Sequence, residues 1–91
     1  MLFDIQKSRE LNHQLKFSFW PGLAIEEIRV RVSKSGGHLF HLFEDKINEG
    51  VFYWTCTSAY IVFPLDVDLD TVIDKFEDDQ EILYIAQPKD N

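Results

Sequence analysis

The sequence predicts an α+β fold, in the form of a ferredoxin-like (split βαβ) antiparallel sheet with helices on one face and a short N-terminal helical extension. Short runs of alternating or continuous apolar residues indicate strands, and apolar residues that recur at three and four positions indicate helices. From residue 15 to residue 88 these patterns follow one another as strand, helical region, strand, strand, helix and strand. This is the element order of the split βαβ arrangement.

The length and composition of the chain predict one folded domain. A chain of 91 residues has room for a single hydrophobic core, and apolar residues make up 45% of it. No repeat or linker-like stretch divides the sequence. We therefore expect residues 1–91 to form one domain, with an N-terminal extension at 1–14 and a disordered tail at 88–91.

The first half of the chain is predicted to contain a helix, a strand and two further helices. Residues 4–14 fit a short polar helix, and residues 15–20 alternate apolar with polar side chains, as a strand does. Residues 23–33 fit either an edge strand or a helix, and we expect the helix. After a Ser/Gly-rich break, helical spacing predicts another helix that ends at Gly50, with the apolar positions Leu39, Phe40, Phe43 and Ile47.

The second half is predicted to contain two strands, a helix and a final strand. Residues 51–57 and 59–65 are rich in aromatic and β-branched side chains and meet at Ser58, either in a tight hairpin or as one long bent strand. Residues 81–87 are predicted to form the last strand. Between them lies the clearest helix, with Asp66 or Asp68 at its start and apolar residues at Leu69, Val72, Ile73 and Phe76.

The net charge of −7 is carried by the last third of the chain. Residues 1–65 hold seven acidic and seven basic side chains, whereas residues 66–91 hold nine acidic and two basic ones. Such a surface repels phosphate groups, so we expect neither direct nucleic-acid binding nor membrane binding. We expect instead a partner protein with a basic surface, such as a nucleic-acid-binding enzyme.

Cysteine content and the N-terminal sequence predict a cytoplasmic protein. Cys56 is the only cysteine, which excludes an intramolecular disulfide and favours a reducing compartment. The N-terminal residues turn charged too early for a signal peptide or a membrane span.

Two groups of residues resemble metal ligands, although each has a simpler explanation. On the predicted helix, His38, His41 and Asp45 would lie close enough to seat a metal ion, but no fourth ligand is evident. Residues 66–70 alternate carboxylates, but Thr71 occupies the position where a calcium-binding EF-hand loop needs glycine. A helix start in solvent explains these carboxylates better, and we expect no metal or cofactor.

Aromatic and acidic residues together indicate a protein-binding surface. The chain has more aromatic surface at Trp20 and residues 52–54 than so small a core must bury, and aromatic residues anchor many interfaces. Carboxylates follow the last predicted helix and can steer the protein onto a basic partner. The candidate partner-binding residues are Asp66, Asp68, Asp70, Asp74, Glu77, Asp78 and Asp79, together with Trp20 and Trp54.

These features favour a non-enzymatic protein-binding module, such as an inhibitor, immunity protein, antitoxin or phage-type antagonist, that blocks a basic surface and imitates nucleic acid. Two alternatives remain open. One is a small metal-dependent hydrolase or nuclease that uses the histidine pair or the carboxylates at 66–70. The other is a structural or regulatory subunit that forms homo-oligomers, dimers for example, through the edge of its sheet.

Overall fold

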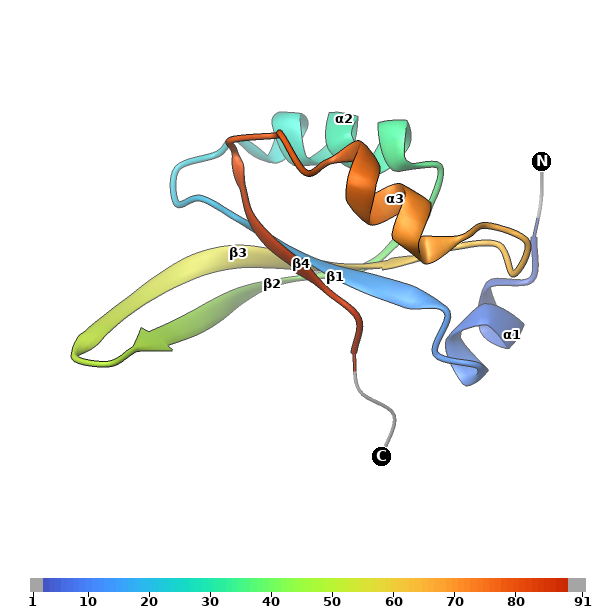
Figure 1. The fold of residues 1–91 in the computed structure, drawn as a ribbon, viewed down its shortest axis with the longest axis horizontal. Helices are drawn as coiled ribbons and strands as arrows, with labels where there is room; N and C mark the ends of the chain where they lie inside the picture. Colours follow the sequence, from blue (N-terminus) through green and yellow to red (C-terminus); the bar gives the residue numbers. More distant parts are fainter. Residues whose placement is uncertain (1–2, 89–91) are drawn as a thin grey trace.

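The computed structural model describes residues 3–88, and residues 1–2 and 89–91 lie outside the described part, including most of the predicted tail. The described residues form three helices and four strands (Figure 1). In chain order these are α1 (Ile5–Glu10), β1 (Gln14–Phe19), α2 (Ile25–Ser35), β2 (His38–Glu49), β3 (Phe52–Val62), α3 (Leu69–Lys75) and β4 (Ile82–Ala86). None of the helices within residues 3–88 is long and apolar enough to cross a membrane.

The four strands form one antiparallel sheet in the order β2-β3-β1-β4. Strand β1 lies in the interior of the sheet and pairs with β3 on one side and β4 on the other. Because β3 runs antiparallel to both β1 and β2, these two strands run in the same direction with β3 between them. Helices α2 and α3 cover one face (Figure 1), so the predicted α+β fold with an antiparallel sheet is confirmed.

Alternation along β1 places its apolar residues in the core. Leu15, Phe17 and Phe19 are completely buried, and they face α2 and α3. The ring of Phe17 meets the ring of Phe76 edge-on, with 5.4 Å between their centroids. Burying each such side chain contributes about 1.5–3 kcal/mol to folding, so β1 provides much of the energy that holds the helices on the sheet.

The helical interpretation of residues 23–33 is confirmed by α2. Ile28 and Val32 are one helical turn apart and both are buried against the sheet. The helix ends at Gly36, whose φ of 82° is a left-handed conformation that glycine adopts without steric penalty. The N-terminal helix is also confirmed, although it is shorter than expected, and the side chain of Asp4 caps it.

The predicted helix that ends at Gly50 is wrong, because this segment forms β2. A register shift between Leu39 and His41 inserts one residue into the strand. Leu39 and Leu42 consequently lie on the same face, opposite Ile61 and Ala59, although they are three residues apart. The bulge therefore produces a spacing that resembles a helix. Gly50, at a φ of 62°, belongs to the turn between β2 and β3.

The tight hairpin at Ser58 is also wrong, and the alternative of one long strand is confirmed. Strand β3 runs without interruption from Phe52 to Val62 and pairs with β2 along this whole length. Ser58 is fully buried in the middle of β3, opposite Ser18 of β1. β1 covers only Thr57–Val62 of β3, so the rest of the β2–β3 hairpin extends beyond the other strands (Figure 1).

Candidate functional site

The sheet face turned away from α2 and α3, which we call the open face, carries a polar network at its centre. The Lys16 ammonium lies 2.6 Å from the Asp45 carboxylate, and the Ser58 hydroxyl donates to the same carboxylate at 3.1 Å. Ser58 also shares a hydrogen bond of 2.8 Å with Ser18. Strands β1, β2 and β3 therefore each contribute a side chain to one connected set of hydrogen bonds.

The electrostatics of this network favour a structural role over a catalytic one. Partial burial lowers the pKa of Lys16, but hydrogen bonding and charge from Asp45 and Tyr84 outweigh it and leave this pKa above the usual lysine value. Burial raises the pKa of Asp45, but hydrogen bonds from Lys16, Ser58 and the Lys46 amide outweigh it and leave this pKa below the usual range. Lys16 stays protonated at neutral pH, so it cannot take a proton from the buried Ser58 hydroxyl.

A second ion pair fastens the loop after α3 to α2. The Arg31 guanidinium contacts both carboxylate oxygens of Asp79, at 2.8 Å from Nε and 3.3 Å from Nη2. The hydrogen bond from Arg31 holds the pKa of Asp79 below its usual range, and the same contact raises the pKa of Arg31. Asp79 is consequently engaged inside the molecule and is not available as a partner-binding carboxylate.

These two pairs predict how stability changes with pH. The folded-state pKa values of Asp45 and Asp79 lie below the unfolded value of about 3.9, so their contribution is complete above that pH and is lost as the pH falls through the folded values. The raised pKa of Lys16 gives a contribution that is complete below about pH 10.4 and is lost as the pH rises through the folded value. Denaturant unfolding over a pH series will show this, and an unchanged acid-side slope in Asp45→Asn would contradict it.

The proposed histidine metal site loses its geometric basis because β2 is a strand. His41 and Asp45 are four residues apart, which is about 13 Å along an extended chain. The Asp45 carboxylate is also already engaged, in an ion pair with Lys16 and a hydrogen bond from Ser58. No group of three His, Cys, Asp or Glu side chains in residues 3–88 is placed to hold a metal ion.

The carboxylates at 66–70 serve the start of α3. The Asp68 side chain accepts from the Asp70 amide at 3.0 Å and from the Thr71 hydroxyl at 3.3 Å. The expectation that Asp66 or Asp68 caps this helix is thus met by Asp68.

The remaining acidic residues divide between the two ends of α3. Asp66 and Asp70 flank its start, Asp74 lies in its last turn, and Glu77 and Asp78 follow its end; all five are exposed. The run continues to Glu81, whose carbonyl oxygen accepts from the backbone N–H of Trp20 at 3.0 Å. The C-terminal end of the acidic run therefore lies beside Trp20.

Trp20 and Trp54, predicted as partner-binding residues, lie together on the open face. Their ring centroids are 5.2 Å apart. Around them is a hollow of about 340 Å³, which we call the aromatic hollow, lined by Trp20, Glu49, Phe52, Tyr53 and Trp54. The sequence alone does not decide whether Phe52 is exposed, and it gives no reason to select Glu49. The pairing of β2 with β3 places these two residues opposite each other, next to the turn at Gly50.

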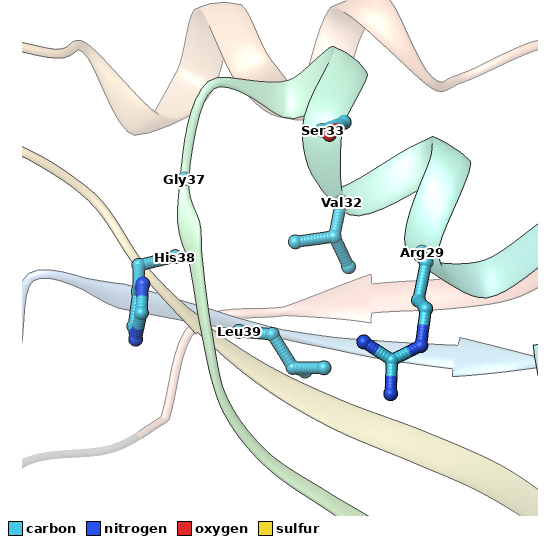
Figure 2. A pocket seen from close by; sticks show the side chains of 6 residues that line it. All are labelled: Arg29, Val32, Ser33, Gly37, His38 and Leu39. Atoms are coloured by element: carbon cyan, nitrogen blue, oxygen red, sulfur yellow. The ribbon is translucent and has the colours of Figure 1, made fainter. Parts of the chain in front are cut away.

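A different hollow, of about 350 Å³, lies between α2 and the start of β2 (Figure 2). Val32 and Leu39 point into this gap, and His38 lies on the other side of β2. Gly37 brings the strand close to the core, since a Cβ there would come within 2.5 Å of Ile61. The polar residues of its lining are Arg29, Ser33 and His38, and no hydrogen bond among residues 3–88 joins their side chains into one set.

Comparison with known proteins gives no independent assignment. No protein-family model and no curated protein matches this sequence.

Proposed function

We propose that this chain is a non-enzymatic protein-binding module of the cytoplasm, and that it acts as an inhibitor, immunity protein, antitoxin or phage-type antagonist. Its recognition surface is the aromatic hollow together with the projecting end of the β2–β3 hairpin. The acidic loop after α3 meets this surface where the Trp20 amide donates to the Glu81 carbonyl oxygen. The partner is a protein that presents a basic surface.

The exposure of apolar side chains at the hairpin end carries this proposal. Val51 is 93% exposed, Phe52 71% and Tyr53 60%, and Trp20 beside them is 43% exposed. Large apolar side chains gathered at one place on a small protein mark interaction sites, because burying them against a partner releases much free energy. The hairpin also projects from the sheet (Figure 1), so a partner can reach both of its faces.

The distribution of charge supports a basic partner. Asp78 and Glu81 are exposed and lie on the loop that reaches Trp20. Carboxylates at the rim of an aromatic surface speed association with a basic protein and orient it, while the buried aromatic rings supply most of the affinity. Imitation of a nucleic-acid backbone is one form that this complementarity can take.

On the level of fold, we propose that the β1–β4 part is a variant of the ferredoxin-like, split βαβ arrangement. The support is that β1 and β2 run in the same direction on either side of β3, and that β4 adds to the free side of β1. The long β2–β3 hairpin and the preceding α1 are the departures from a compact form of it.

A homo-oligomer that pairs through a sheet edge is less well supported. Strand β2 is one edge of the sheet, but it carries a bulge and charged side chains at Glu44, Lys46 and Glu49. Bulges and charges are the features by which edge strands avoid pairing with other chains. Light scattering over a range of concentrations tests this alternative, which requires a mass that rises above that of the monomer.

The proposed function is tested by photo-crosslinking in a lysate of the source organism. Benzoylphenylalanine in place of Phe52 is expected to give one dominant adduct with a basic protein. The same group in place of Phe40, which is also exposed but lies near the other end of β2, serves as the matched control and should not give that adduct. Equal adducts from both positions would overturn the placement of the surface.

A pair of charge reversals tests the acidic border. Asp78→Lys with Glu81→Lys should abolish the adduct, whereas Asp66→Lys with Asp74→Lys should leave it unchanged at the same net charge. All four residues are exposed, and the cap Asp68 and the ion-paired Asp79 are left intact. Loss of the adduct in both variants would show that only the overall charge matters.

A further inference from the structure

The aromatic hollow combines ring faces with one carboxylate. Trp20, Phe52 and Trp54 surround it, and Glu49 stands at its edge, directly opposite Phe52 in the strand register. The two indole rings lie in contact at 5.2 Å, which leaves no room for a ligand between them. A ligand therefore lies against their outer faces, beside Phe52 and the carboxylate.

One cation of the chain lies at the border of the hollow, because the Lys46 ammonium is 5.9 Å from the centroid of the Tyr53 ring. Within residues 3–88, cationic side chains lie over the rings of Phe40, Phe43, Tyr53, Phe76 and Tyr84, and not over those of Trp20, Phe52 or Trp54. Glu49 forms no ion pair in this part of the chain. The hollow thus combines three aromatic rings that carry no cation from residues 3–88 with a carboxylate that has no ion pair there, and together these groups attract a cation.

We propose that the aromatic hollow binds an arginine side chain of the partner protein. A guanidinium group is planar, stacks on indole rings and can form two parallel hydrogen bonds with one carboxylate. An ammonium group is a compact and strongly hydrated charge, so it gains less from a flat aromatic surface. The loop that carries the exposed Asp78 and Glu81 contacts the backbone of Trp20, and its negative charge adds to the attraction for a cationic segment.

The two tryptophans of the chain both lie in this hollow, so tryptophan fluorescence reports on it directly. The full chain is titrated with a short uncharged peptide that contains one arginine, and with the same peptide carrying citrulline or lysine in its place. We expect the dissociation constant of the arginine peptide to be lower than that of the neutral citrulline peptide by about fivefold. The lysine peptide should fall between them.

Substitutions in the aromatic hollow test whether the arginine peptide binds there. Glu49→Gln and Phe52→Ala replace exposed residues and should reduce the arginine preference to about twofold or less, whereas Phe40→Ala should leave it unchanged. Trp54→Leu should remove it, and thermal melting checks that this variant folds. Equal affinity for the arginine and citrulline peptides, a lysine peptide that binds as tightly as the arginine peptide, or a preference that survives Glu49→Gln and Phe52→Ala would overturn the proposal.

This inference rests on the proposed function, but its test needs no partner. If crosslinking at Phe52 succeeds and arginine and citrulline peptides bind equally, the assignment of arginine fails and the protein-binding function stands. If the peptides bind as expected and no adduct forms at Phe52, the hollow binds arginine but the proposed function fails.

Discussion

Replacing Phe17 by alanine will lower the free energy of unfolding by about 3–5 kcal/mol, as large-to-small changes of fully buried aromatic residues do. Phe17 is completely buried in the interior strand and contacts both Phe19 and Phe76, so its removal leaves a cavity between the sheet and α3. A domain of this size has a total stability of about 5–13 kcal/mol. The variant will therefore be unfolded to a large extent at moderate denaturant concentration, which circular dichroism will measure.

Two matched variants make this expectation specific. Phe17→Leu keeps most of the buried volume and should lose clearly less stability than Phe17→Ala. Phe52→Ala removes the same side chain from an exposed position and should change stability by less than about 0.5 kcal/mol. Comparable losses in Phe17→Ala and Phe52→Ala would show that the core is not organised around β1.

Replacing Asp45 by alanine is expected to lower the free energy of unfolding by about 2 kcal/mol. The change leaves the Lys16 ammonium and the Ser58 hydroxyl without their shared partner. The loss is smaller than for a fully buried ion pair because the two charged side chains keep about a fifth of their surface exposed, where water screens the unpaired charge. Urea unfolding at neutral pH measures it.

A double-mutant cycle separates the pair from its surroundings. Lys16→Met should also be destabilising, because it leaves the Asp45 carboxylate without the ammonium. The double variant Lys16→Met with Asp45→Ala should lose less than the sum of the single changes, with a coupling free energy of about 1–2 kcal/mol. Strict additivity would mean that the 2.6 Å contact between the two side chains contributes nothing to stability.

The elements that the sequence predicts correctly are those whose pattern is set locally. Alternation of apolar and polar residues indicates β1, and the spacing of Ala24, Ile25 and Ile28 after Pro21 favours the helix α2. The carboxylate of Asp68 caps α3 as its position suggested. In each case the periodicity of one element and the chemistry of its first residue decide the structure.

The β2–β3 hairpin could not be predicted in this way because its register depends on residues far apart in the sequence. The bulge near Phe40 gives β2 the spacing of a helix, and only pairing with β3 resolves the ambiguity. The composition of the aromatic hollow could not be predicted for the same reason. Trp20 and Trp54 could be selected as interface residues, but Glu49 joins them only because the chain turns at Gly50.

The interior position of β1 has a consequence for the order in which the sheet can be assembled. The β2–β3 hairpin joins neighbours in the sequence, but β1 pairs with β4, where Lys16 lies opposite Ala86, a residue far from it in the sequence. Closing so long a loop is entropically unfavourable, and contacts of this kind slow folding. During synthesis β1 must therefore wait until β4 has been made before both of its edges are paired, and until then one row of its backbone hydrogen-bonding groups remains open to other chains.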